Sequence, residues 1–495
     1  MLLYYVFAVQ KSMRRRCKNK NLHEKIFVKK AAVHNLGCKV NSYELDVMTQ
    51  KLKEDGYEIV PFDEKADVYV INTCTVTNIA DRKSRQMLHR AKALNKDAVV
   101  VAVGCYVETD EAGVEQDPAI DLAIGNNRKG EIAQILEAYL KSRGEGNPAE
   151  KTLGGATLED ISKAPLFEDM QLRTPGRTRA DIKIQDGCNQ FCSYCIIPYA
   201  RGRIRSRDPL EIQEEITALA QEGVKEVVLT GIHIGSYGKE KGLSPDKELL
   251  SLLTRIQMIR GIERIRLGSL EPRIMTENFV RGISGLSKLC PHFHLSLQSG
   301  CNRTLRRMNR HYTAKEYYDS VVLLRKYFDR PAITTDVIVG FPGETEDEFE
   351  ESRAFCEKVG FYEIHVFKYS VRHGTVAAGL PDQKTNAQKA ARSDVLLALT
   401  KEQAERYRAG FIGQEEELLL EEEVTLNGER FYKGHTKRYV EGILTAEAAE
   451  RVAGDAGLQS PCGMLVKGTL LREAEGTACL RMDPGSAKAL KSDPK

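Results

Sequence analysis

Two groups of three cysteines are the residues of this sequence with the most chemical potential. The first group lies in the loop Cys188-Asn189-Gln190-Phe191-Cys192-Ser193-Tyr194-Cys195, which has C-x3-C-x2-C spacing. Three thiolates can hold three irons of a [4Fe–4S] cube and leave the fourth iron open to a small molecule. The second group, Cys38, Cys74 and Cys105, is spread through the first part of the chain. We therefore predict two [4Fe–4S] clusters, each held by three cysteines.

Two other uses of cysteine fit this pattern less well. Structural zinc sites pair two C-x2-C knuckles, whereas this chain has a single C-x2-C without a matching partner. A disulfide framework is disfavoured because twelve cysteines among 495 residues is a low density and nothing marks the chain as secreted. The remaining six cysteines have no ligand spacing: Cys17, Cys290, Cys301, Cys356, Cys462 and Cys479.

Composition and charge indicate a globular protein of two to four domains. Hydrophobic residues make up 42% and charged residues 29%, and no apolar run is long enough for a membrane span. Residues 1–29 are expected to be a disordered basic extension outside the fold. Because residues 1–30 carry nine Lys/Arg and one Glu, the rest of the chain has a net charge of about −5. Any site for a polyanion must therefore be local, and one candidate is the basic stretch 173–207 around the cysteine loop.

Segment 30–145 alternates strand and helix patterns, which predicts an α/β domain of three layers around a mostly parallel sheet. Strands are expected at 27–34, 67–72 and 98–104, and helices at 42–55, 80–94 and 131–141. Cys38, Cys74 and Cys105 each lie just beyond the end of one of these strands. Because ligand sites gather at the carboxyl ends of strands in such sheets, we expect the three cysteines to converge.

Six further strand–helix patterns follow a linker predicted at 146–178, and they indicate an incomplete (β/α)6 barrel over 179–410. Polar and glycine-rich segments follow its strands, at the end where barrel enzymes carry their active sites. These segments are the cysteine loop, 230–231, 269–272, 298–300 and 340–344. Residues 411–472 show short strand patterns typical of a small antiparallel β-barrel, and residues 473–495 are expected to be a disordered tail.

The motifs of the chain resemble those of the radical S-adenosylmethionine methylthiotransferases over about residues 30–472. The cysteine loop is followed by Ile-Ile-Pro-Tyr-Ala-Arg-Gly-Arg-Ile-Arg-Ser-Arg, as in that family. Residues 434–437 (Gly-His-Thr-Lys) resemble its TRAM domain, an RNA-binding β module, although this module carries an excess of acidic residues here. Other matching segments are Asn35–Asn41, Asn72–Thr77, Val103–Cys105, Thr230–Ile232, Leu295–Gly300, Arg307–Arg310, Thr335–Gly343 and Tyr369–Arg372.

The resemblance implies a radical reaction at a carbon that acid–base chemistry cannot activate. S-adenosylmethionine would bind the cluster of Cys188, Cys192 and Cys195, and the cluster of Cys38, Cys74 and Cys105 would present a methylated sulfur. Tyr194, Gly231, Gln298 and Gly340 would contact S-adenosylmethionine, although Tyr194 could instead be a packing residue. Arg201, Arg203, Arg205, Arg207, His435 and Lys437 would contact RNA, although the arginines could instead balance cluster charge.

Within the family, Gly-Cys-Lys-Val-Asn at Cys38 resembles the MtaB branch. This similarity implies methylthiolation of C2 of N6-threonylcarbamoyladenosine at position 37 of tRNA. A reduced flavodoxin- or ferredoxin-type electron donor, a monomeric state, a cytoplasmic location and no membrane association are implied with it. Three alternatives stay open: the same chemistry on isopentenyladenosine-37, the same chemistry on a ribosomal-protein aspartate, or a non-catalytic RNA-binding Fe–S protein.

Overall fold

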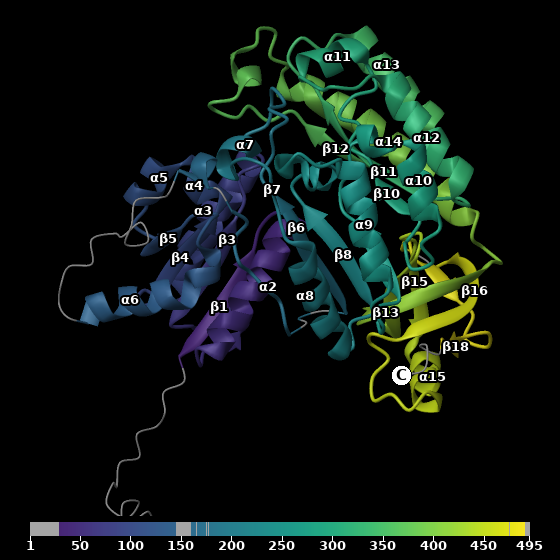
Figure 1. The fold of residues 1–495 in the computed structure, drawn as a ribbon, viewed down its shortest axis with the longest axis horizontal. Helices are drawn as coiled ribbons and strands as arrows, with labels where there is room; N and C mark the ends of the chain where they lie inside the picture. Colours follow the sequence, from purple (N-terminus) through teal and green to yellow (C-terminus); the bar gives the residue numbers. More distant parts are fainter. Residues whose placement is uncertain are drawn as a thin grey trace, which may run out of the picture.

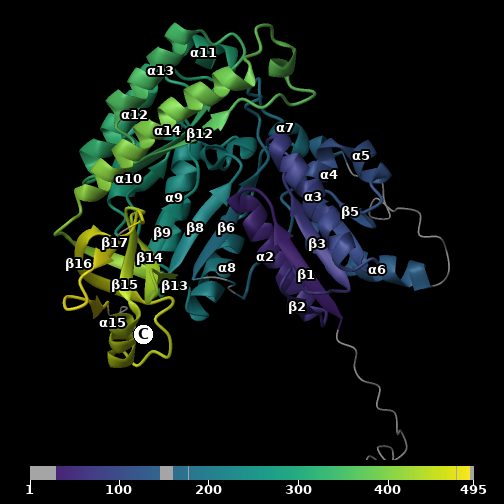
Figure 2. The ribbon, with the colours of Figure 1, turned by 180° about the vertical axis from the view of Figure 1, so that it is seen from behind.

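The computed structural model describes residues 29–144, 160–164, 166–174, 176, 178–474 and 476–490. The expected basic extension, apart from Lys29, lies outside the described residues. Figure 1 shows an N-terminal α/β domain beside a central α/β part, which carries a small β-rich module at one end. Figure 2 shows the same arrangement from behind, with the central part in contact with the other two. This three-part α/β fold confirms the predicted fold class.

The N-terminal domain is a five-stranded parallel sheet in the order β2-β1-β3-β4-β5. β3 and β4 are buried at every position because their apolar, largely β-branched side chains fill both faces of the sheet. α2 and α6 pack on one face and α3 on the other, which makes the predicted three layers. The edge strands β2 and β5 and the short helices α4 and α5 were not predicted. The bounds are β1 Lys30–Asn35, α2 Lys39–Glu54, β2 Glu58–Val60, β3 Val68–Thr73, α3 Asn78–Leu94, β4 Val99–Gly104, α4 Cys105–Thr109, α5 Glu111–Gln116, β5 Leu122–Ile124 and α6 Ile132–Gly144.

The central part contains the six predicted parallel strands in the order β6-β8-β9-β10-β11-β12. The parallel bridge Leu270–Leu295 joins the segments that directly follow β9 and β10. No pairing closes β12 onto β6 among the described residues, so the barrel is open. Helices cover its outer face. The bounds are β6 Arg179–Asp186, α7 Ile197–Ala200, β7 Arg205–Ser206, α8 Pro209–Gln221, β8 Glu226–Gly231, α9 Pro245–Gln257, β9 Arg264–Leu267, α10 Glu277–Ser284, β10 His292–His294, α11 Asn302–Arg307, α12 Ala314–Tyr327, β11 Ala332–Val339, α13 Glu346–Val359, β12 Glu363–Lys368 and α14 Asn386–Ala409.

Capping residues explain why three of these helices begin where they do. Thr313, Thr345 and Thr385 each accept a hydrogen bond from the backbone N–H three residues later. The Glu or Gln side chain at that later position accepts a hydrogen bond from the backbone N–H of the threonine. This capping box satisfies two of the amide groups left free at a helix start.

The C-terminal module is a closed five-stranded β-barrel, with β18 added at one side. Its strands run β13-β14-β15-β17-β16, and β16 returns to pair with β13. The expected small β-barrel is confirmed, but β15 and β17 are parallel, so it is not wholly antiparallel. The bounds are β13 Glu415–Leu426, β14 Glu429–Thr436, β15 Glu441–Thr445, α15 Ala446–Asp455, β16 Leu465–Glu473, β17 Leu480–Met482 and β18 Lys488–Ala489.

The segments predicted as a tail and a linker take part in the fold. The prediction of a disordered tail is wrong for β17 and β18, because Leu480 and Met482 are buried in the core of the C-terminal barrel. Inside the expected linker, Met170 and Leu172 pack in the main core, and the Tyr43 hydroxyl donates to the Met170 carbonyl at 2.6 Å. None of the helices in the described residues combines the length and the apolar character that a membrane span requires.

Candidate functional site

The loop after β6 brings Cys188, Cys192 and Cys195 together as free thiols. The backbone N–H of Cys195 donates to the Cys192 carbonyl at 2.9 Å, and that of Cys188 donates to the Gly202 carbonyl at 3.0 Å. Burial raises the pKa of Cys188 to about 11 and that of Cys195 to about 12, and the negative charge of a Cys192 thiolate acts in the same direction on both. Thiols of this kind ionise readily only when a metal replaces the proton.

A cationic side chain that the sequence analysis missed lies against this loop. Arg310 follows α11 and donates from Nη1 to the Sγ of Cys192 at 3.1 Å. Its other terminal nitrogen lies 3.6 Å from a carboxylate oxygen of Glu271. In the sequence, Arg310 stands out only as the last residue of the motif Arg307–Arg310, because nothing there shows that residues 118 positions apart meet. Three clustered thiols with one guanidinium fit a [4Fe–4S] cluster, whose thiolate ligands carry negative charge.

Replacing Arg310 with glutamine should make the reduction potential of the cluster held by Cys188, Cys192 and Cys195 more negative. The cation and its hydrogen bond to Cys192 favour the reduced state of the cluster. Their loss is expected to lower the midpoint reduction potential by about 60 mV, which is a tenfold change in the equilibrium constant for one-electron reduction. A redox titration followed by electron paramagnetic resonance measures this potential. Arg303→Gln, at a half-exposed arginine on α11, is the control and should leave it unchanged. An unchanged midpoint in Arg310→Gln would contradict the electrostatic role.

The predicted contacts of S-adenosylmethionine lie at the carboxyl ends of the barrel strands. Gly231 ends β8, and an added Cβ there would come within 2.8 Å of the Gln185 carbonyl oxygen. Gln298 follows β10 and Gly340 follows β11, both with positive φ. Tyr194 packs edge-on against Phe341, with ring centroids 6.4 Å apart. Gly231, Gln298 and Gly340 therefore lie at the same ends of the barrel strands as the cysteine loop, which contains Tyr194, and the binding role of all four stays a prediction.

Cys38, Cys74 and Cys105 meet at the carboxyl edge of the N-terminal sheet. Cys38 precedes α2, Cys74 follows β3 and Cys105 begins α4. Gly37 packs so closely that an added Cβ would lie 3.1 Å from the Sγ of Cys74. Burial, together with the negative charge of thiolates at Cys105 and Cys38, raises the pKa of Cys74 to about 12. Three free thiols in mutual electrostatic contact fit a second three-cysteine cluster site.

A buried network of charges joins the two cysteine sites and corrects the predicted RNA contacts. Arg201 is fully buried; it donates to Glu44 at 2.8 Å and to Asn41 at 2.7 Å, and it pairs with Asp186. Lys183 and Lys129 also pair with Glu44. The prediction that Arg201, Arg205 and Arg207 meet tRNA phosphates is therefore wrong, because all three are buried between the N-terminal domain and the barrel.

The other predicted RNA contacts differ in their accessibility. Arg203 is exposed and lies over the ring of Phe191, 4.6 Å from its centroid. Lys437 is partly exposed, with Glu417 at 3.6 Å. His435 is buried where the C-terminal module meets the barrel, and Glu421 lies 2.8 Å from its Nδ1. The prediction of an RNA contact is therefore wrong for His435 and stays a prediction for Arg203 and Lys437.

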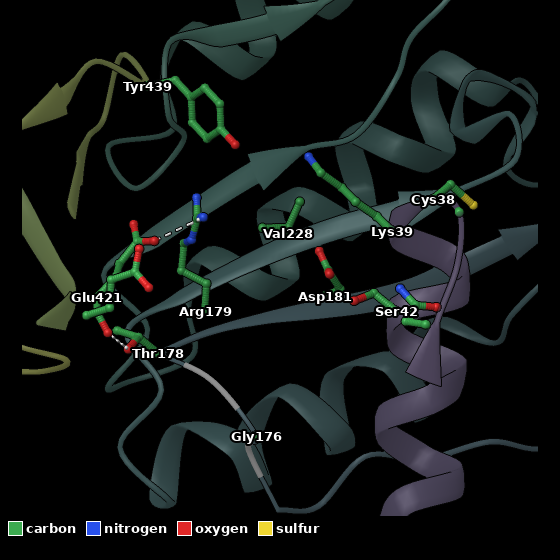
Figure 3. Close-up of a pocket in the computed structure, with 13 residues that line it drawn as sticks. Cys38, Lys39, Ser42, Gly176, Thr178, Arg179, Asp181, Val228, Glu421 and Tyr439 are labelled. Atoms are coloured by element: carbon green, nitrogen blue, oxygen red, sulfur yellow. Dashed lines mark hydrogen bonds and ion pairs between the residues drawn. The ribbon is translucent and has the colours of Figure 1, made fainter. Parts of the chain in front are cut away.

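A cavity of about 600 Å³ lies where the three parts of the molecule meet. Figure 3 shows Cys38 at one end of it and Tyr439 at the other, with Arg179 between them and strand β8 passing behind. Tyr439 is held by stacking against His292 and His435, with ring centroids 4.5 and 4.6 Å apart. The cavity is lined by Asn35, Gly37, Cys38, Lys39, Ser42, Gly176, Thr178, Arg179, Asp181, Val228, Glu421, Glu422 and Tyr439.

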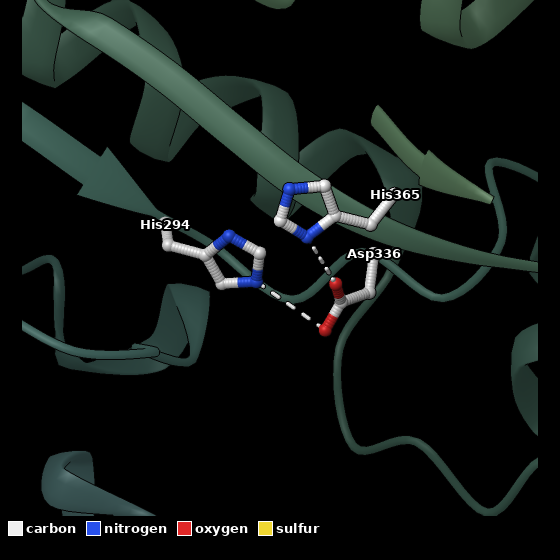
Figure 4. A group of neighbouring side chains, drawn as sticks. All are labelled: His294, Asp336 and His365. Atoms are coloured by element: carbon white, nitrogen blue, oxygen red, sulfur yellow. Dashed lines mark ion pairs between the residues drawn. The ribbon is translucent and has the colours of Figure 1, made fainter. Parts of the chain in front are cut away.

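His294, Asp336 and His365 gather on three neighbouring strands and have the composition of a metal site (Figure 4). Each imidazole has a nitrogen 3.3 Å from the Asp336 carboxylate. Hydrogen bonds to Asp336 and Glu363 raise the pKa of His365 to about 10. With its imidazole protonated, His365 forms an ion pair with Asp336 on the barrel wall.

His365→Gln should destabilise the protein more at pH 6 than at pH 10. A group whose pKa rises from 6.5 to about 10 on folding contributes stability below pH 6.5, and that stability is lost as pH rises through 10. Because the side chain is 46% exposed, solvent screening limits the effect to about 1 kcal/mol at pH 6. Denaturant titrations of both proteins at the two pH values measure it, and equal deficits at both would contradict the ion pair.

Comparison with known proteins identifies the family. Residues 182–356 match the radical SAM superfamily and residues 30–125 match the uncharacterized protein family UPF0004. The chain is 40% identical over 415 residues to the threonylcarbamoyladenosine tRNA methylthiotransferase MtaB of Bacillus subtilis, covering 83% of this chain and 90% of that protein. It is 36% identical over 393 residues to the tRNA-2-methylthio-N(6)-dimethylallyladenosine synthase of Moorella thermoacetica, covering 78% of this chain and 85% of that protein.

A solved structure supports the fold independently. The radical S-adenosylmethionine methyltransferase TsrM of Kitasatospora setae, solved with cobalamin and a [4Fe–4S] cluster, superposes with a TM-score of 0.51. It shares 18% identity and covers 69% of this chain and 75% of its own, so the likeness concerns the fold alone. The extent and identity of the sequence matches show that this chain belongs to the radical S-adenosylmethionine methylthiotransferase family and is a tRNA-modifying enzyme that uses [4Fe–4S] and S-adenosylmethionine.

Proposed function

We propose that this enzyme adds a methylthio group to C2 of N6-threonylcarbamoyladenosine at position 37 of tRNA. The observation that carries the proposal is the convergence of two three-cysteine sites, one at the mouth of the barrel and one at the sheet edge beside it. Similarity to proteins named for threonylcarbamoyladenosine supports this base as the substrate.

The two groups of cysteines and Arg310 would have separate roles in this reaction. When bound, the clusters and S-adenosylmethionine supply radical hydrogen removal and sulfur transfer, which acid–base groups cannot provide at C2 of adenine. Cys188, Cys192 and Cys195 would hold one cluster, and Arg310 would neutralise part of its charge. Cys38, Cys74 and Cys105 would hold the other. Reaching C2 requires adenine to leave its stack in the anticodon loop, and the cavity beside Cys38 offers room for it.

A second candidate substrate is dimethylallyladenosine, because relatives of comparable identity are named for it. The non-catalytic alternative and the ribosomal-protein alternative are set aside, since the family shown is that of tRNA-modifying enzymes. The proposal further includes a reduced flavodoxin- or ferredoxin-type electron donor, a monomeric enzyme and a cytoplasmic location. A tRNA substrate is consistent with that location.

Mass spectrometry of digested tRNA tests the substrate. In cells lacking the gene, 2-methylthio-N6-threonylcarbamoyladenosine should be absent, and a wild-type copy should restore it, whereas a Cys192→Ala copy should not. If that nucleoside is unchanged by deletion, and the methylthio form of isopentenyladenosine disappears instead, the substrate is the second candidate.

A further inference from the structure

Lys39 places a cation in the cavity where the three parts of the molecule meet. It is the first residue of α2 and lines that cavity next to Cys38. Figure 3 shows its amine directed away from the Cys38 thiol, towards the end of the cavity at Tyr439. Within the described part of the chain, its amine makes no hydrogen bond and no ion pair. A lysine in this position is available to a ligand that enters the cavity.

Most other charged groups of this cavity are already paired. Arg179 lies 3.1 Å from Glu421 and 3.8 Å from Glu226. Glu421 is also bound by His435, and Glu422 pairs with Lys433 at 3.1 Å. Asp181 also lines the cavity, where it interacts with other groups and attracts the Lys39 amine electrostatically. Among the described charged groups that line the cavity, the Lys39 amine is therefore the one most open to a ligand.

We propose that Lys39 binds the carboxylate of the threonyl group on the substrate adenine. This inference rests on the proposed function, since only that substrate carries a carboxylate on N6. C2 and the carbon that carries N6 flank N1 of adenine, and their outward bonds point in different directions. When C2 faces the sulfur source at Cys38, a group on N6 can therefore extend along the cavity, the direction of the Lys39 amine. A dimethylallyl group has no charge for Lys39 to bind.

Three anticodon stem-loop RNAs that differ only on N6 of adenosine 37 test the proposal with the reconstituted full-length enzyme. The first carries the threonylcarbamoyl group, the second carries its threoninamide counterpart, with a carboxamide in place of the carboxylate, and the third carries a dimethylallyl group. Binding is measured by fluorescence anisotropy and turnover by mass spectrometry. The wild-type enzyme should bind the carboxylate RNA about tenfold more tightly than the carboxamide RNA, since a hydrogen bond between charged groups is worth about that factor.

The variants separate a substrate contact from a structural role. Lys39→Met and Lys39→Gln should both lose the tenfold preference and bind the carboxamide RNA as wild type does. Lys53→Met, at an exposed lysine in the last turn of the same helix, should keep the preference. The optical spectra of both clusters should not change in any variant. If the Lys39 variants keep the preference for the carboxylate RNA, or if their affinity falls by the same factor for all three RNAs, the proposal is wrong. If wild-type enzyme modifies only the dimethylallyl RNA, the proposed function itself has failed.

Discussion

Cys192→Ala is expected to abolish both S-adenosylmethionine cleavage and methylthiolation, whereas Cys74→Ala is expected to abolish methylthiolation alone. Cys192 belongs to the loop that follows β6 of the barrel, at the strand ends where the predicted S-adenosylmethionine contacts lie. Cys74 lies at the edge of a different sheet, in the N-terminal domain. Each variant leaves two thiols, too few to hold a [4Fe–4S] cube, so each should contain about half the wild-type iron.

Two products measured in one reaction separate these outcomes. With a reductant, S-adenosylmethionine and tRNA, 5′-deoxyadenosine reports cleavage and the methylthio nucleoside reports transfer. Cys74→Ala should still form the first product at close to the wild-type rate, and Cys192→Ala should form neither. Cys462→Ala removes an exposed thiol of the C-terminal module and should behave as wild type. If Cys74→Ala also failed to cleave S-adenosylmethionine, the two cysteine sites would not have separate roles.

Glu44→Gln should destabilise the protein by about 3–5 kcal/mol, the usual cost of removing one partner from a buried ion pair. Glu44 is fully buried and bound by Arg201, Lys129 and Lys183. Burial by itself would raise the pKa of Glu44, but these three cations hold it well below its usual range. The substitution keeps the shape of the side chain and leaves three buried cations with less negative charge between them.

Denaturant unfolding measures this effect, and its pH dependence gives a second check. Because the pKa of Glu44 is lowered on folding, its contribution is present above its ordinary value of 4.5 and is lost as pH falls below it. The difference between wild type and Glu44→Gln should therefore shrink in acid. Glu350→Gln, which breaks an exposed pair with Arg353, is the control and should cause no measurable change. A Glu44 variant as stable as this control would show that the network does not hold the two domains together.

The sequence by itself determined the elements and the two cysteine groups. The six parallel strands of the barrel were predicted, and all six are observed (β6, β8, β9, β10, β11 and β12). Those predictions succeeded because apolar runs between glycine-rich turns are a local signal. The edge strand β5 and the paired segments β17 and β18 have only two or three residues each, too few to show a period.

Only the tertiary structure decided what the charged residues do. Arg201, Arg205 and Arg207 form a basic stretch with exposed Arg203 in the sequence, yet those three are buried beside acidic side chains. Arg310 touches Cys192 across 118 positions. Charge in a sequence gives no sign of burial, because that depends on partners brought in from distant segments. Chain topology placed Glu44 among three cations and left Lys39 without a partner among the described residues.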